Sequence, residues 1–91
     1  MAVQEGRQAL LDRWIELDPS GLDPQEARLA GYGVTVWSLI AYLRVAQGDI
    51  ARVARDYDLP PDAVRAAEVY YEGHRYLIDA RIALNEAAFA R

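Results

Sequence analysis

The sequence contains no cysteine and no lysine, and it has a single histidine. Without cysteine, neither a disulfide framework nor a thiolate metal site can support so short a chain. One histidine and scattered carboxylates match no usual metal-ligand spacing, so we expect no metal and no other cofactor. No segment approaches the roughly 18 apolar residues of a membrane span, and the N-terminus lacks a signal-peptide pattern. These absences predict a cytoplasmic protein with no membrane partner.

Length and composition predict a single, mainly α domain covering residues 1–91. The apolar fraction is 53% and much of it is alanine, which favours helix. A chain of this size buries only about 60% of its unfolded surface, so we expect it to gain stability as a homodimer or with a partner. The net charge of −4 argues against a typical nucleic-acid-binding protein. All ten basic residues are arginine, which can still bind phosphates if several converge.

The N-terminal third predicts a helix followed by a small β element. Apolar residues from Val3 to Leu17 recur at helical spacing, which predicts an amphipathic helix within residues 1–18. Proline and glycine in the segment 18–24 end it. The two glycines at 31 and 33 and the β-branched run 34–36 then predict a short β-hairpin or extended arm. Such a hairpin is barely stable alone, so it must pack on the helices or pair across a dimer.

The centre of the chain predicts three helices separated by clear signals. Residues 36–46 form an apolar stripe that Gly48 ends in the C′ position. Asp49 caps a short helix over 50–57, and Asp58 begins a turn that needs left-handed backbone. Pro60 and Pro61 suit the start of the next helix, which pauses at Gly73-His74 before the extension 74–91. The inward positions of a helix-turn-helix within residues 26–71 are Val53, Tyr57, Leu59, Val64 and Ala67, and the alternative is a plain helical hairpin.

The surface that such a motif would present to DNA is poorly suited to reading base edges. A recognition helix reads DNA with the outward residues of its first two turns, here Pro61, Asp62, Arg65, Ala66 and Glu68. Only the arginine could contact guanine, and the two acids repel phosphates. The candidate DNA-binding residues are therefore Arg52, Arg55 and Arg65. Any DNA binding by this chain alone is expected to be weak.

Residues 26–71 also follow the order of a known family pattern. The pattern comprises a glycine turn, a Val-Trp helix start, a Gly-ended helix, an Asp-Tyr turn and an Ala-Ala…Tyr-Tyr helix. The matching residues are Gly31, Val36-Trp37, Gly48, Asp56-Tyr57, Leu59, Val64, Ala66-Ala67 and Tyr70-Tyr71. In these features the chain resembles the bacterial family called domain of unknown function 433, which includes VapB-like antitoxins. The resemblance implies a helix-turn-helix dimer, assisted by a β-arm, that restrains a PIN-like ribonuclease toxin. The family's Thr-Arg-Ile-Pro is replaced by residues 32–35, so the role of that arginine does not carry over.

The C-terminal extension carries apolar residues on more sides than one core contact requires. One interpretation is that it packs back on the N-terminal helix with Trp14 as its partner. The other is that it forms an arm binding a groove of the toxin. The candidate partner-binding residues are Tyr76, Leu77, Leu84 and Phe89. Tyrosines around His74 could suggest acid–base chemistry, but no Ser or Cys nucleophile lies nearby, so we expect no enzyme.

Three functions follow in order of preference. The first is an antitoxin-like interaction protein of a type II toxin–antitoxin module, which neutralises a PIN-like nuclease and regulates its own operon through the helix-turn-helix. The second is a stand-alone dimeric DNA-binding regulator, and the third is an adaptor with no nucleic-acid role. An acidic surface favours the first, because a nuclease site is basic or metal-loaded.

Overall fold

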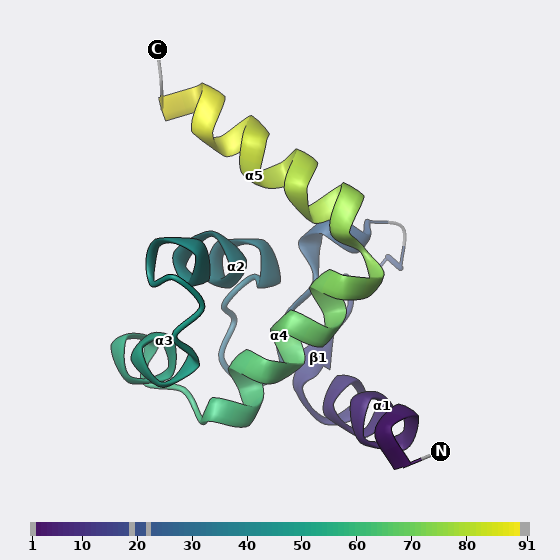
Figure 1. The fold of residues 1–91 in the computed structure, drawn as a ribbon. Coiled ribbons are helices and arrows are strands. Elements are labelled where there is room, and N and C mark those ends of the chain that lie inside the picture. The colour runs from purple at the N-terminus through teal and green to yellow at the C-terminus, as the bar shows by residue number, and fades with distance from the viewer. Residues whose placement is uncertain (1, 19, 22, 90–91) are drawn as a thin grey trace.

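Four α-helices lie around a fifth, central one in the part of the chain that the structure describes. The computed structural model describes residues 2–18, 20–21 and 23–89, and side chains are described from residue 5 onward. The elements are α1 (Ala2–Trp14), β1 (Ile15–Glu16), the 3-10 helix η1 (Pro24–Glu26), β2 (Arg28–Leu29), α2 (Val36–Val45), α3 (Ile50–Tyr57), α4 (Pro61–Gly73) and α5 (Arg75–Phe89). Helix α4 contacts α1, α2 and α3, and α5 leads away from the body at its end (Figure 1). The prediction of a mainly α fold is confirmed.

The core is built on the inward faces of α2, α3 and α4. The predicted stripe of α2 is buried, with Val36 fully inaccessible and Ala46 beyond the helix end 5% exposed. Helix α4 contributes small residues and one large one, Tyr70, whose hydroxyl donates a 2.7 Å hydrogen bond to the carbonyl of Pro24. Small residues let the neighbouring helices approach α4 closely, and the tyrosine fills the remaining space. This bond also fixes η1 against the helix.

The N-terminal helix is shorter than predicted. Helix α1 ends at Trp14, and Ile15–Glu16 form a strand that pairs antiparallel with Arg28–Leu29, Ile15 opposite Leu29. The carbonyl of Trp14 accepts a hydrogen bond from the Ala30 amide at 2.7 Å, so a partner distant in sequence replaces the next helical turn. Leu17, predicted on the apolar helical face, is 61% exposed. Val3 lies outside the residues whose side chains are described.

The predicted hairpin exists only in part, and it is not an arm. The chain turns at Gly31 and Gly33, both at positive φ, and the Leu29 amide donates to the Val34 carbonyl at 2.7 Å. A single bridge, Arg28 to Thr35, closes this turn, while the main partner of β2 is β1. The predicted second strand ends early because α2 begins at the end of the β-branched run. Leu29 is fully buried, so this segment belongs to the core.

Two turns of the same type position α3. After α2, Gln47 takes the left-handed conformation (φ 57°), and the Gly48 amide bonds the Leu43 carbonyl at 2.9 Å. The C′ position is therefore Gln47 and not Gly48 as predicted, since the glycine lies one residue later. After α3, Asp58 is left-handed as predicted (φ 56°, ψ 50°), and the Leu59 amide bonds the carbonyl of Ala54 at 2.8 Å. Three residues, 58–60, join α3 to α4.

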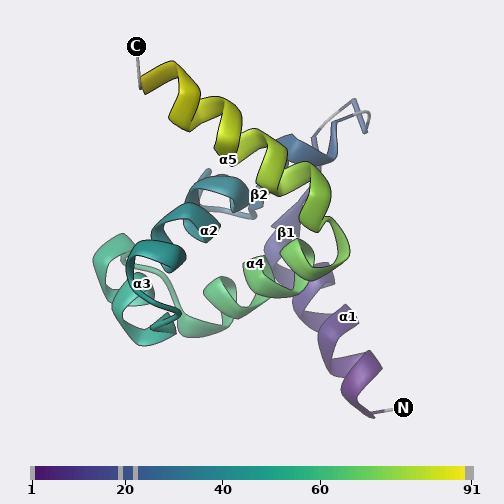
Figure 2. The ribbon, with the colours of Figure 1, turned by 45° about the horizontal axis from the view of Figure 1, so that its top comes forward.

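The break before α5 falls where the sequence indicates it. Helix α4 ends at Gly73, and His74 leaves the helical conformation (φ −135°, ψ 30°). Helix α5 then packs against α2 and η1, whereas α1 packs against α4. The ends of α1 and α5 point in opposite directions (Figure 2). The interpretation in which the C-terminal helix packs on the N-terminal helix is wrong, and Trp14 instead lies beside Tyr32, with ring centres 6.4 Å apart.

Candidate partner-binding and DNA-binding surfaces

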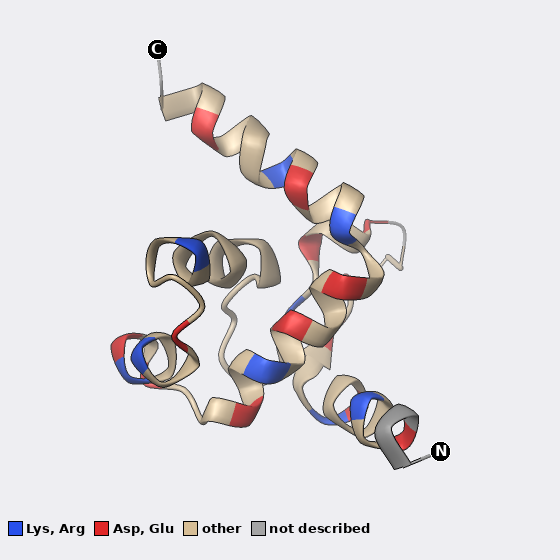
Figure 3. Ribbon diagram, in the orientation of Figure 1, with Lys and Arg blue, Asp and Glu red and all other residues tan. Residues whose placement is uncertain are grey.

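The three candidate DNA-binding arginines are exposed, but each is paired with an acid. On α3, Asp56 lies 3.7 Å from Arg52 and 3.8 Å from Arg55. On α4, Arg65 forms a 2.8 Å ion pair with Asp62. Acidic and basic residues accordingly lie side by side on both helices (Figure 3). This surface offers little net positive charge to a phosphate backbone.

Asp56 is the centre of a small polar network that was not predicted from the sequence. The hydroxyl of Tyr42 donates a hydrogen bond to its carboxylate, and this bond to an anion raises the pKa of the tyrosine. The Arg52 guanidinium also lies over the Tyr42 ring, 5.9 Å from its centre. A signal was available, because acids and arginines three or four residues apart on a helix are neighbours. Arg52 and Asp56 have the spacing i, i+4, and Asp62 and Arg65 the spacing i, i+3.

The outward face of α4 is narrower than predicted. Ala66, predicted to face DNA, is fully buried, and Glu68 is only partly exposed. Helix α1 packs along α4, and its Arg7 and Leu11 lie beside Val69, which is one turn after Ala66. The prediction failed because no local signal shows that α1 covers this side. Pro61, Asp62 and Arg65 remain exposed.

Helix α5 is held to the body along one side. Ile78 and Ile82, one turn apart, are 0% and 2% exposed. Arg81 lies over the Trp37 ring, 4.4 Å from its centre, and its guanidinium lies 3.5 Å from the carboxylate of Glu26. These contacts reach η1 and α2, which explains why the helix runs where it does.

A second set of contacts holds α5 near its start. Asp79 accepts a hydrogen bond from the Tyr71 hydroxyl at 2.8 Å and pairs with Arg44 of α2. The hydrogen bond from Tyr71, and then the contact with Arg44, lower the pKa of the Asp79 carboxyl. The Gln25 side chain donates to the Leu77 carbonyl at 3.0 Å. The first two turns of α5 are therefore tied to three other elements.

All four candidate partner-binding residues are exposed on α5. Tyr76 is 84% exposed, Leu77 36%, Leu84 64% and Phe89 83%. The first three lie on the side of the helix away from Ile78 and Ile82, together with exposed alanines; the set is Tyr76, Leu77, Ala80, Ala83, Leu84, Ala87 and Ala88. We call these seven residues the outer face of α5. It contains no charged or hydrogen-bonding side chain other than the tyrosine hydroxyl.

Phe89 differs from the other three candidates in its position. It follows Ile78 and Ile82 at spacings of eleven and seven residues, so it lies on the side of α5 that contacts the body. It is nevertheless exposed, because α5 diverges from α2 toward its C-terminal end (Figure 1). The last turns of α5 therefore have exposed apolar residues on two sides.

The tyrosines around His74 have structural contacts. The Tyr70 ring lies 4.0 Å from the His74 ring, centre to centre, and the histidine Nδ1 is 3.0 Å from the Tyr70 carbonyl. Tyr71 takes part in the contacts of Asp79, and Tyr76 lies on the outer face of α5. These contacts account for the cluster through packing and helix termination.

Comparison with models of known protein families, with curated proteins and with solved structures finds no match to this chain. Membership of the antitoxin family thus stays a prediction. Over the described residues, no helix has both the length and the apolar character needed to cross a membrane. The same residues bring together no group of three or more histidine or carboxylate side chains that could hold a metal ion.

Proposed function

We propose that this protein is an antitoxin-like interaction protein that binds and neutralises a toxin nuclease through α5. The observation that carries the proposal is the outer face of α5, an uncharged apolar surface on a helix that is anchored on its opposite side. Isolated exposed apolar residues are common on proteins, but a contiguous apolar face marks an interaction surface. The partner class, a PIN-like ribonuclease, comes from the family resemblance.

The arrangement suits binding of a helix in a groove. Such helices present anchors at spacings of three, four and seven residues. Leu77 and Leu84 are seven residues apart, and Ala80 and Ala87 occupy the positions between and after them. Since α5 is already ordered by the body, its binding would cost less conformational entropy than that of a disordered tail.

The proposal includes a helix-turn-helix formed by α3, residues 58–60 and α4. The short turn with left-handed Asp58 and the burial of Val53, Leu59, Val64 and Ala67 support it. We assign this unit a mainly architectural role, because its arginines are paired with acids. DNA binding then requires homodimerisation or the toxin to supply further positive charge.

The test is co-expression of the protein with a PIN-like nuclease encoded beside it. The proposal expects a complex that survives size-exclusion chromatography and a nuclease whose cleavage of an RNA substrate is suppressed. Replacing Leu84 by glutamate should weaken the complex at least about tenfold, since a charge is buried without a partner. The matched control is Val45→Glu, because Val45 is exposed to a similar extent (68%) but lies on α2.

Two results would refute the proposal. One is a nuclease that remains fully active in the presence of excess protein. The other is a complex that Leu84→Glu and Val45→Glu affect equally, which would place the interface elsewhere. Native mass spectrometry of the complex gives the stoichiometry and thereby tests the expected homodimer.

A further inference from the structure

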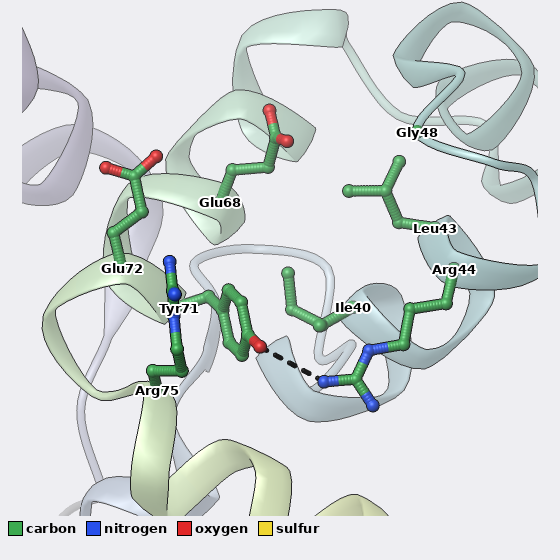
Figure 4. A pocket seen from close by; sticks show the side chains of 8 residues that line it. All are labelled: Ile40, Leu43, Arg44, Gly48, Glu68, Tyr71, Glu72 and Arg75. Atoms are coloured by element: carbon green, nitrogen blue, oxygen red, sulfur yellow. Dashed lines mark hydrogen bonds between the residues drawn. The ribbon is translucent and has the colours of Figure 1, made fainter.

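A cavity of about 300 Å³ lies between α2, α4 and the first residue of α5. This volume is at the lower end of the range for small-molecule sites, roughly 300–1,000 Å³. Its lining residues are Ile40, Leu43, Arg44, Gly48, Glu68, Tyr71, Glu72 and Arg75 (Figure 4). Ile40 and Leu43 of α2 face Glu68, Tyr71 and Glu72 of α4 because each set repeats at helical spacing. The cavity therefore combines an apolar side with a charged one.

Two of the four charged residues in the lining are engaged in ion pairs. Arg44 pairs with Asp79 and donates a hydrogen bond to the Tyr71 hydroxyl at 3.1 Å. Glu72 forms an ion pair with Arg7 of α1 at 2.5 Å. Neither side chain is therefore available to a ligand without losing an existing contact.

The other two charges are opposite in sign, and each has an opposite charge nearby, Arg65 for Glu68 and Asp79 for Arg75, but not within ion-pair distance. Glu68 has no ion pair or hydrogen bond among the described residues, and burial together with nearby Glu72 raises the pKa of its carboxyl. Arg75 has no carboxylate within ion-pair distance in the same part of the chain, and it lies 5.5 Å from the centre of the Tyr71 ring. Figure 4 shows both side chains on the side of the cavity opposite Ile40 and Leu43, with Arg75 beside the Tyr71 ring. Glu68 belongs to α4 and Arg75 to α5, and the apolar side chains of Ile40 and Leu43 line the same cavity, so a ligand that reaches both charges needs an apolar part between two charged ends.

We propose that this cavity binds a small zwitterion whose ammonium and carboxylate groups are separated by an apolar chain, as in an ω-amino acid or a C-terminal lysine. The ammonium pairs with Glu68 and the carboxylate with Arg75. The intervening methylene groups lie on the Tyr71 ring and against Ile40 and Leu43. This site is separate from the outer face of α5 and does not depend on the function proposed for that face.

The experiment is an NMR titration of the full chain with 6-aminohexanoate. Two ligands of the same chain length that lack one charge, hexanoate and hexylammonium, serve as comparisons. We expect the zwitterion to bind at least about tenfold more tightly than either, because charge-assisted hydrogen bonds contribute more than neutral ones. Amide shifts should concentrate at Gly48 and Tyr71. Nα-acetyl-lysine carries the same two charges and represents a C-terminal lysine as the ligand. Tighter binding of 6-aminohexanoate than of Nα-acetyl-lysine indicates that the ligand is a free small molecule.

Two variants test the assignment of each charge. Glu68→Gln should weaken 6-aminohexanoate about tenfold and leave hexanoate unchanged, and Arg75→Gln should weaken it about threefold and leave hexylammonium unchanged, since Arg75 is exposed. Glu86→Gln, an exposed acid further along α5, is the matched control and should change nothing. Equal binding of all three ligands, or shifts centred away from the cavity, would overturn the proposal. The same holds if neither variant alters the preference for the zwitterion.

Discussion

Arg65 and Asp62 form an ion pair on the exposed side of α4, with Nη1 and Oδ1 2.8 Å apart. Arg65 is the one side chain of the first two turns of α4 suited to reading guanine, so the pair occupies the residue on which direct readout of DNA would depend. Asp56 has the same relation to Arg52 and Arg55 on α3. Exposed pairs of this kind contribute little to stability, about 0–1 kcal/mol, so their main effect is on surface charge.

Removing the acidic partners of these arginines should create measurable DNA affinity. We expect the wild-type chain to bind a mixed-sequence duplex more weakly than about 10⁻⁴ M at physiological salt, with almost no salt dependence. The double variant Asp56→Asn/Asp62→Asn should bind more tightly, and log K should fall with log salt at a slope of about −2 to −3 as two or three phosphates are engaged. Fluorescence anisotropy across a salt series measures both. The control Asp12→Asn/Glu86→Gln changes net charge equally, and an identical gain there would contradict this account.

The hydrogen bond from Tyr70 to the Pro24 carbonyl should be visible in the stability of the fold. Tyr70→Phe removes the donor and keeps the ring, so we expect a loss of about 1 kcal/mol in the free energy of unfolding. Tyr76→Phe, at an 84% exposed position, should stay within about 0.5 kcal/mol of wild type. Urea denaturation measures both values. Equal effects would show that the bond contributes nothing.

The same residue predicts a pH dependence. Burial, and secondly the charge of Asp23, raise the pKa of Tyr70 above its ordinary value in the folded state. Folding therefore favours the protonated phenol, and its stabilising contribution is complete below the unfolded pKa of about 10 and is lost as the pH rises through the folded pKa. Wild type should lose stability above that pH more steeply than Tyr70→Phe, as measured by unfolding at several alkaline pH values. Parallel pH profiles of the two proteins would contradict the assignment.

The centre of the chain could be predicted because its signals are local. Asp49 accepts a hydrogen bond from the Arg52 amide at 3.1 Å, as its place before a helix indicates. Asp58 adopts the left-handed conformation that ends α3, and Pro61 begins α4. Each feature depends only on residues within one turn, and such short-range preferences are the ones that a sequence states directly.

The remaining features depend on contacts between distant residues. Ile15 continues the helical pattern of α1, but pairing with Leu29, fourteen residues later, makes it a strand. Ala66 resembles a solvent-facing residue until α1 is seen to pack along α4. The direction of α5 depends in part on the contact between the Arg81 guanidinium and the Trp37 ring of α2. The apolar residues of α5 occupy more sides than one neighbour can cover, and the four chosen as partner-binding candidates are exposed, while their role in binding stays a prediction. The charges of Glu68 and Arg75 in the cavity were not predicted, because helical spacing does not show which acids form ion pairs with arginines.

The turn after α2 should be improved by glycine. Gln47 holds a left-handed conformation, which costs a residue with a side chain roughly 1 kcal/mol. Gln47→Gly should raise the free energy of unfolding by about 0.5–1 kcal/mol. The matched control is Gln8→Gly within α1, where the same change should cost about 0.5–1 kcal/mol. Thermal unfolding of the two variants compares them directly, and a loss of stability in both would show that Gln47 is not strained.

Truncation separates the part of α5 that stabilises the fold from the part that is free for a partner. Removing residues 86–91 takes away Phe89 but no buried side chain among the described residues, so unfolding should stay cooperative and its midpoint should change little. Removing everything after Gly73 also takes away Ile78 and Ile82, and losing a buried isoleucine side chain typically costs about 2–5 kcal/mol. Against a total stability of roughly 5–15 kcal/mol, this larger deletion should abolish cooperative unfolding. Circular dichroism during denaturation measures both. If the chain ending at Gly73 unfolds at the wild-type midpoint, α5 is a dispensable arm and its anchoring contacts do not stabilise the fold.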